Sequence, residues 1–194
     1  VSGAWSLPIW RTGTTFLLSG SYVDSMLVKH LKPLEIKGLS WSVTPAIIQE
    51  FLATATRQFT FYAGLEIKDS KTLIDDLKTD MDRMRVFVAG PRWTSLDRSG
   101  RTSLSADLHW GIPGFLGGSE AEDANATRLH SGGDFIYYAA SAARLQRLPA
   151  GFVWLVRGSG QWSDGALTSV EQMRIGGSAG VRGYSESEAA GDYG

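Results

Sequence analysis

The sequence has no cysteine among its 194 residues, which excludes disulfide bonds, thiol catalysis and cysteine-based metal sites. It also has no excess of charge, because nineteen basic and twenty acidic side chains leave a formal net charge of -1. A sequence-wide field therefore does not attract nucleic acid or an anionic membrane surface. We expect no nucleic-acid partner.

A long apolar run is missing as well. No stretch approaches the roughly 18 to 20 apolar residues that a membrane-spanning helix requires, which excludes insertion as helices. Insertion as strands stays open, because a spanning strand needs only about 9 to 11 residues and every second one can be polar.

Motifs for cofactors and catalysis are also lacking. His30 and His130 have no ligand-spaced partner, so no metal site is expected. The glycine-rich region 176–183 has neither a P-loop ending nor the flanks of a dinucleotide fingerprint, and we expect no cofactor. Ser103, Ser105, Asp107 and His109 share one face of one predicted strand, where residues lie about 6 to 7 Å apart and cannot converge as a catalytic triad.

What the sequence does contain is alternation of apolar and polar residues. The alternation is without error from Arg101 to Ile112 and from Arg57 to Lys68, which predicts two strands. Weaker alternation predicts six more, over Gly3–Ile9, Gly13–Val23, Leu34–Thr44, Arg83–Trp93, Gly133–Leu145 and Gly151–Ser163. We therefore predict an all-β, antiparallel fold of about eight strands.

The polar rows of the two strong strands are expected to face the lumen of a barrel. They consist of Gln58, Thr60, Glu66 and Lys68 on one strand and of Arg101, Ser103, Ser105, Asp107 and His109 on the other. Aromatic residues near strand ends suit the interfacial girdles of a membrane barrel. These are Trp5, Trp10, Tyr22, Trp41, Trp93, Trp110 and Trp162.

The connections alternate between tight and long. Tight connections are expected at Trp10–Gly13, Asp97–Gly100 and Leu148–Gly151, and long ones at Asp24–Pro33, Asp69–Asp82 and Pro113–Ser131. This alternation is typical of an up-and-down outer-membrane barrel, with tight turns in the periplasm and long loops outside the cell. The Gln49–Thr56 connection is intermediate and fits least well. Within Asp69–Asp82, apolar residues recur at intervals of about 3.6 residues. This spacing is equally compatible with a short helix and with an irregular loop.

The C-terminal stretch carries a motif. Its elements, in order, are Glu171-Gln172, Gly176-Gly177, Val181-Arg182-Gly183-Tyr184, Glu186 and Gly191-Asp192-Tyr193-Gly194. Their order and spacing resemble the signature loop of the two-partner secretion transporters, which secrete and activate haemolysins and filamentous haemagglutinins. Met173 stands where that family usually has Phe, and Ala179-Gly180 replaces the commoner residue before Val181.

The resemblance implies a fold and a location. Residues 1–170 would form part of a transmembrane β-barrel, about the fourth to the eleventh of about sixteen strands, and residues 171–194 would be the signature loop, folded into the lumen. We expect the chain to be a segment of a longer protein whose POTRA domains and remaining strands lie outside it. That protein would be a monomeric barrel in contact with outer-membrane lipid of a Gram-negative bacterium.

The resemblance also implies a function without bond chemistry. The barrel would export and activate a large exoprotein, such as a haemolysin or a filamentous adhesin, that is unfolded in transit. An insertase of the same superfamily, with about five POTRA domains rather than two, is an alternative. A soluble β-sheet binding module is another.

The family pattern assigns roles within the loop. Arg182 would latch the loop to a carboxylate on a later strand, which lies outside this chain, because a guanidinium binds a carboxylate bidentately. Val181, Gly183 and Tyr184 belong to the same latch. The expected supporting residues are Glu171, Gly176, Gly177, Gly180, Gly191 and Asp192, whose glycines permit positive φ.

Overall fold

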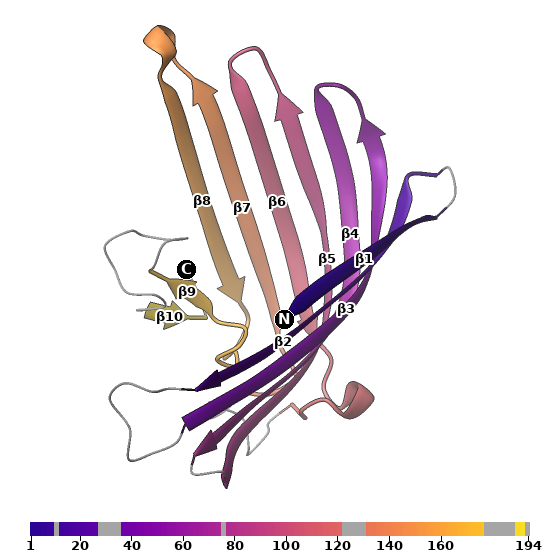
Figure 1. Ribbon diagram of the computed structural model, residues 1–194, viewed down its shortest axis with the longest axis vertical. Helices are drawn as coiled ribbons and strands as arrows, with labels where there is room; N and C mark the ends of the chain where they lie inside the picture. The colour runs from indigo at the N-terminus through magenta and orange to yellow at the C-terminus, as the bar shows by residue number, and fades with distance from the viewer. Residues whose placement is uncertain (10–11, 27–35, 75–76, 122–130, 177–188, 193–194) are drawn as a thin grey trace.

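In the computed structural model, residues 1–9, 12–26, 36–74, 77–121, 131–176 and 189–192 are described. Eight strands form one antiparallel sheet in which each strand pairs with the next along the chain, and β1 and β8 are its open edges (Figure 1). The strands are β1 (Ser2–Ile9), β2 (Thr14–Met26), β3 (Ile36–Ala53), β4 (Arg57–Ile74), β5 (Leu77–Leu96), β6 (Gly100–Gly111), β7 (Ile136–Arg147) and β8 (Val153–Ser163). The all-β, partial-barrel prediction is confirmed.

The sheet has two chemically different faces. One row of paired residues crosses all eight strands with apolar side chains on what we call the outer face: Leu7, Phe16, Ile47, Ala63, Ala89, Leu108, Tyr138 and Trp162. The adjacent row contains Gly64, Val88, His109 and Tyr137 and lies on the opposite, inner face. Alternation along the strands separates the faces, because successive side chains point to opposite sides.

The outer face has the character of a lipid-facing barrel wall. Trp5, Leu104 and Trp162 are 55%, 47% and 56% exposed, whereas a water-facing sheet would carry polar residues at such positions. The described members of the expected aromatic girdles, Trp5, Tyr22, Trp41, Trp93, Trp110 and Trp162, all project from this face. Trp10 lies outside the described residues.

A charge on the outer face is therefore expected to be costly. Leu104→Arg should lower the free energy of unfolding of the parent barrel by about 2 kcal/mol, because arginine must then reach from the lipid to water. The neighbouring Ser105→Arg, on the inner face, should cost less than about 1 kcal/mol. Urea unfolding in lipid vesicles measures both. Equal losses would contradict the assignment of the faces.

Four tight connections lie at one end of the sheet, which we call the turn end. They are 10–13, 54–56, 97–99 and 148–152, the last including a 3-10 turn, Pro149–Gly151. The prediction of an intermediate connection at Gln49–Thr56 is wrong, because β3 continues to Ala53. A bulge between Glu50 and Leu52 breaks the alternation there while the ladder continues, which hides the strand in the sequence. With β3 extended to Ala53, the connection between β3 and β4 is as tight as the three turns that the sequence predicts.

The prediction of a long connection at Asp69–Asp82 is also wrong. β4 continues to Ile74 and β5 begins at Leu77, so only residues 75–76 lie between them, and the spacing that suggested a helix belongs to two paired strands. Cross-strand pairing overrode the local pattern. Asp69 also has a partner on β5, because its Oδ1 accepts a hydrogen bond from Arg85 Nη1 at 2.8 Å.

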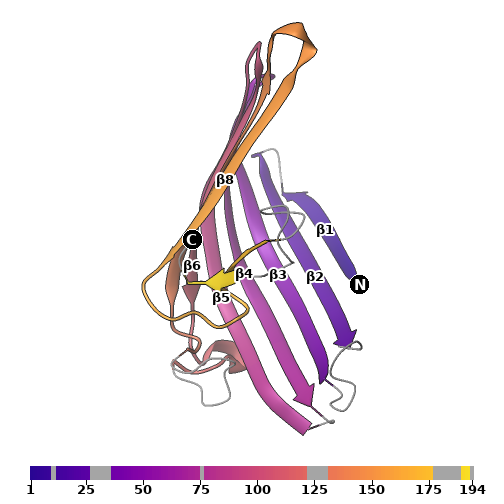
Figure 2. The same cartoon turned by 90° about the vertical axis from the view of Figure 1, so that its left-hand side faces the viewer.

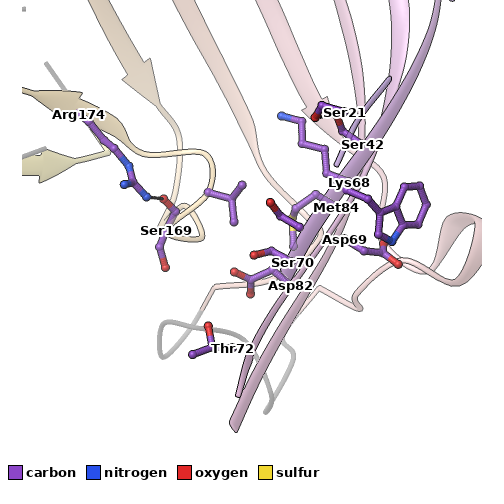
Figure 3. Close-up of a pocket in the computed structure, with 13 residues that line it drawn as sticks. Ser21, Ser42, Lys68, Asp69, Ser70, Thr72, Asp82, Met84, Ser169 and Arg174 are labelled. Atoms are coloured by element: carbon purple, nitrogen blue, oxygen red, sulfur yellow. Dashed lines mark hydrogen bonds between the residues drawn. The ribbon is translucent and has the colours of Figure 1, made fainter. Parts of the chain in front are cut away.

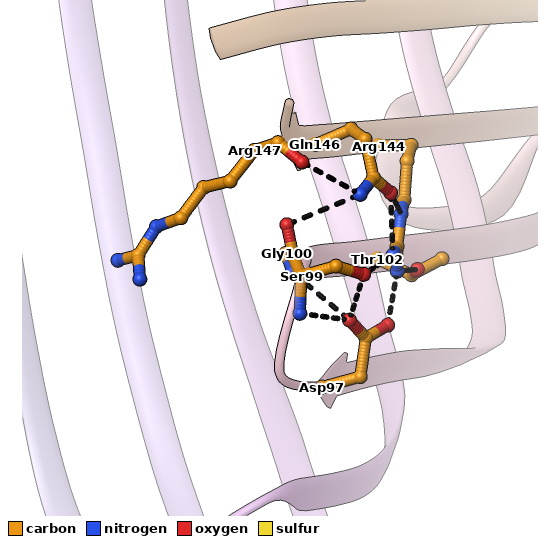
Figure 4. A network of polar contacts seen from close by, with 7 residues as sticks. All are labelled: Asp97, Ser99, Gly100, Thr102, Arg144, Gln146 and Arg147. Atoms are coloured by element: carbon orange, nitrogen blue, oxygen red, sulfur yellow. Dashed lines mark hydrogen bonds and ion pairs between the residues drawn. The ribbon is translucent and has the colours of Figure 1, made fainter. Parts of the chain in front are cut away.

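The turn between β5 and β6 is fastened by Asp97 (Figure 4). Its Oδ1 accepts hydrogen bonds from the backbone N–H groups of Ser99 and Gly100 at 2.8 and 2.9 Å, and its Oδ2 accepts one from Arg144 on β7 at 2.5 Å. The hydrogen bond from Arg144, followed by those from Ser99, holds the pKa of Asp97 well below its usual range. The turn is thus tied to the next hairpin by a carboxylate.

This carboxylate makes a pH-dependent contribution to stability. Because the pKa of Asp97 is lower in the folded protein, its contribution is present above the unfolded pKa of about 3.9 and is lost as pH falls toward the folded value. We expect the difference in unfolding midpoint between wild type and Asp97→Asn to stay constant from about pH 5 to 8 and to shrink below about pH 4. A difference that grows on acidification would contradict this. The effect should be small, since the pair is exposed to solvent.

Candidate functional site on the inner face

The chain after β8 folds back against the inner face of the sheet (Figure 2). After residues 164–172 it forms β9 (Met173–Ile175), which pairs in antiparallel fashion with β10 (Ala189–Gly191). Its described residues lie against the half of the inner face that is away from the turn end. The structure therefore places the beginning and the end of the C-terminal motif against the wall.

Leu167 anchors the segment through apolar contact. Its side chain is fully buried, with 0% exposure, in a cluster with Met84, Val86 and Val88 of β5 and with Phe135 and Tyr137. These β5 residues project from the inner face, where an apolar stripe would be unusual in a water-filled lumen. The stripe is explained by the leucine that covers it.

Glu171 anchors the segment through charge. Its side chain is 1% exposed; Oε1 accepts a hydrogen bond from Lys68 Nζ at 3.0 Å and Oε2 accepts one from Tyr137 Oη at 2.9 Å. Lys68 also contacts Glu66 at 2.5 Å. Gln161 of β8 donates to the backbone carbonyl of Glu171 at 3.1 Å. The side chain of Glu171 thus binds strands β4 and β7, and its backbone carbonyl binds β8.

The two ends of the motif meet at the base of the β9–β10 pair. Asp192 Oδ1 accepts hydrogen bonds from the backbone N–H of Leu167 at 3.2 Å and from Gln172 Nε2 at 3.1 Å. Gly191 pairs with Met173, and Gly176 has φ of 115°, a conformation that favours glycine. Glu171, Gly176, Gly191 and Asp192 are therefore brought together. Val181, Arg182, Gly183, Tyr184, Gly177 and Gly180 lie outside the described residues.

The wall around the anchor is polar. The expected lumen rows of β4 and β6 do project from the inner face: His109 stacks on Tyr137 with ring centroids 4.2 Å apart, and Arg92 pairs with Asp107 at 3.3 Å. No convergent catalytic group is formed by this row, since its residues contact neighbouring strands instead of one another.

A cavity of about 460 Å³ separates the returning segment from strands β2 to β5. Figure 3 shows Ser169 and Arg174 on one side and the wall residues on the other. Half of the ten wall residues that line it carry hydroxyl groups: Ser21, Ser40, Ser42, Ser70 and Thr72. The hydroxyl groups of Ser21 and Ser42 form a hydrogen bond with each other, with their Oγ atoms 2.9 Å apart. Small hydroxyl side chains offer hydrogen bonds without strong attachment.

Sequence reasoning named Glu171, Glu66 and Lys68 but did not connect them. Tyr137 and Leu167 were missed. Leu167 is an isolated apolar residue in a polar stretch, and Tyr137 belongs to a strand whose alternation is imperfect because its inner row includes apolar residues. Only contact between distant segments gives these residues their roles.

The model of the haemolysin secretion/activation protein family, described as ShlB/FhaC/HecB, matches residues 1–194. The chain belongs to this family. Proteins of the ShlB/FhaC/HecB family are outer-membrane β-barrel transporters of two-partner secretion in Gram-negative bacteria. The family prediction made from the C-terminal motif is confirmed.

Solved structures support the fold of this family member. CdiB from Escherichia coli is 20% identical, with a TM-score of 0.84 over 99% of this chain and 36% of that one. CdiB from Acinetobacter baumannii is 15% identical, with a TM-score of 0.73 over 98% of this chain and 34% of that one. The chain thus spans about a third of either structure. No curated protein matches it.

Two features are absent from the part of the chain that the structure describes. None of its helices has the length and apolar character needed to cross a membrane. Within the same residues, no group of three or more histidine, aspartate or glutamate side chains is arranged to hold a metal ion.

Proposed function

We propose that the parent protein exports and activates a large exoprotein, of the haemolysin or filamentous adhesin kind, through the lumen of its barrel. Membership of the ShlB/FhaC/HecB family over residues 1–194 is the observation that carries this proposal. The turn end would face the periplasm, and the opposite end, which holds the longest connections, would face the cell exterior. The exoprotein would enter unfolded at the turn end.

The division of the sheet into two faces supports transport through the lumen. A central row of the outer face is apolar across all eight strands, as contact with lipid requires. The inner face carries hydroxyl groups and paired charges, and the returning segment lies on it. A segment attached by Glu171 and Leu167 narrows the lumen, and its displacement would widen the passage. We assign Glu171 and Asp192 to this attachment.

Secretion in a bacterial host tests the function. Deleting the gene should abolish release of its exoprotein into the medium while the exoprotein stays in the periplasm, and a plasmid copy should restore release. Unchanged secretion in the deletion strain, or loss of all outer-membrane proteins on deletion, would contradict the proposal. The second result would instead indicate an insertase.

Arg182 provides the sharpest variant from the signature motif. Arg182→Ala should strongly reduce secretion or the amount of folded barrel, with synthesis of the exoprotein unchanged, because alanine removes the bidentate partner of a carboxylate. Arg182→Lys should restore little, since lysine keeps the charge and loses the fork. Immunoblots of the medium and the outer membrane measure both quantities. Wild-type secretion at normal barrel abundance would contradict the latch.

A further inference from the structure

The turn end of the inner face carries an exposed apolar row that the returning segment does not reach. Leu96, Arg101, Leu145 and Leu155 pair across β5 to β8 in one line, and Val153 follows next to it on β8. Leu96, Leu145, Leu155 and Val153 are 51%, 43%, 56% and 61% exposed. An apolar lining on the lumen side is unexpected, and no described segment covers it. We call these residues, with the arginines described next, the mouth patch.

Three arginines are interleaved with these apolar residues. Arg101 lies opposite Leu145, while Arg147 and Arg157 lie two residues beyond the Leu145–Leu155 pair on either side of it. Directly opposite residues on neighbouring strands have Cβ atoms about 4.5 to 5.5 Å apart, and diagonal neighbours are about 7 to 8 Å apart. In Figure 4 the Arg147 side chain extends away from the Asp97 network, on the other side of the sheet.

The described carboxylates near the turn end bind groups other than these three arginines. Asp97 binds Arg144 on the outer side of the turn, Asp107 pairs with Arg92 deeper in the lumen, and Glu50 on β3 accepts from Gln58. Among the described residues, no ion pair joins Arg101, Arg147 or Arg157 to an acidic side chain. The mouth patch is therefore apolar and positively charged at once.

The geometry points to the mouth patch as a binding surface at the entrance of the lumen for the transported chain, selecting extended segments that present apolar and acidic side chains on the same face. This rests on the proposed function. In an extended segment, alternate residues share a face at about 6 to 7 Å, which is close to the spacing between the leucines and arginines. Positive charge at the mouth would also raise the local concentration of acidic segments. Farther along the lumen, Ser105 and Ser141 continue as hydroxyl groups, which would release what the mouth has bound.

Photo-crosslinking in the whole transporter, reconstituted in phospholipid nanodiscs, tests the patch. Benzoylphenylalanine replaces Leu155 in one protein and its neighbour Trp154 in the other; these residues are 56% and 59% exposed on opposite faces. The probes are fluorescent peptides with the repeat Leu-Ser-Asp-Ser or Leu-Ser-Lys-Ser. Both place leucine and the charged residue on one face of an extended chain.

We expect position 155 to label the aspartate peptide about tenfold more than the lysine peptide, and position 154 to label neither above background. Arg101→Glu/Arg157→Glu should remove this preference, and Arg101→Lys/Arg157→Lys should keep it. Equal labelling of both peptides at 155, or equal labelling at 154 and 155, would overturn the inference. So would crosslinks from 155 to the transporter's own chain that exclude the peptides.

Secretion by the unlabelled transporter is measured in parallel. Selective labelling without any secretion would contradict the proposed function and leave the peptide-binding surface supported. Normal secretion without selective labelling would overturn the mouth patch alone. The two failures are therefore distinguishable.

Discussion

Glu171→Leu is expected to lower the free energy of unfolding of the parent barrel by about 3 kcal/mol. Leucine has a similar volume but leaves the Tyr137 hydroxyl without its acceptor and Lys68 without one of its two carboxylates. Removing one member of a buried ion pair costs more than the pair contributes, because the remaining charge loses its compensation. Denaturant unfolding followed by tryptophan fluorescence measures the loss.

Glu66→Leu is the matched control for this variant. Glu66 contacts the same Lys68 at 2.5 Å but is 22% exposed and belongs to the wall itself. We expect Glu66→Leu to lower the free energy of unfolding by less than Glu171→Leu does. The returning segment should stay in place. Single-channel conductance separates the two, since release of the segment enlarges the open lumen. Equal conductance in both variants would mean that Glu171 does not hold the segment.

Leu167→Ala is expected to cost about 3 kcal/mol, because it removes methyl groups from a site with 0% exposure and leaves a cavity against Val86 and Phe135. The segment should also detach more readily. Limited proteolysis within 164–176 should therefore become faster along with the loss in unfolding free energy. The variant tests apolar attachment separately from charge.

Val170→Ala provides the control in the same segment. Val170 is 40% exposed, so its truncation should change the unfolding free energy by less than about 0.5 kcal/mol. Similar proteolysis rates for Leu167→Ala and Val170→Ala would contradict the anchor. Resistance of both variants to protease would place the attachment elsewhere in the loop.

The extent of the strands was predictable where alternation is unbroken. Arg57–Lys68 and Arg101–Ile112 correspond to parts of β4 and β6, and their polar rows lie on the inner face. The prediction failed at 69–82 and near Glu50. There the strands continue through polar residues and a bulge, because cross-strand hydrogen bonds extend a ladder regardless of local pattern.

The candidate site was predictable only in part. The motif named Glu171 and Asp192, but their partners lie elsewhere in the chain: Lys68 is 103 residues and Tyr137 is 34 residues from Glu171. A sequence pattern reports neighbours along the chain, so it does not show which strand an isolated charge will meet. The apolar residues on the inner face of β5 looked like imperfect alternation, and contact with Leu167 explains them.

The sequence by itself determined the family, the number of strands in the main sheet and the two faces of the strongest strands, because alternation with period 2 and an ordered glycine-rich motif are local properties. The tertiary structure alone decided that Glu171 and Leu167 fasten the returning segment to the wall, and that leucines and arginines gather at the turn end. These features arise from the register between strands, which the summed pairing of the whole sheet sets.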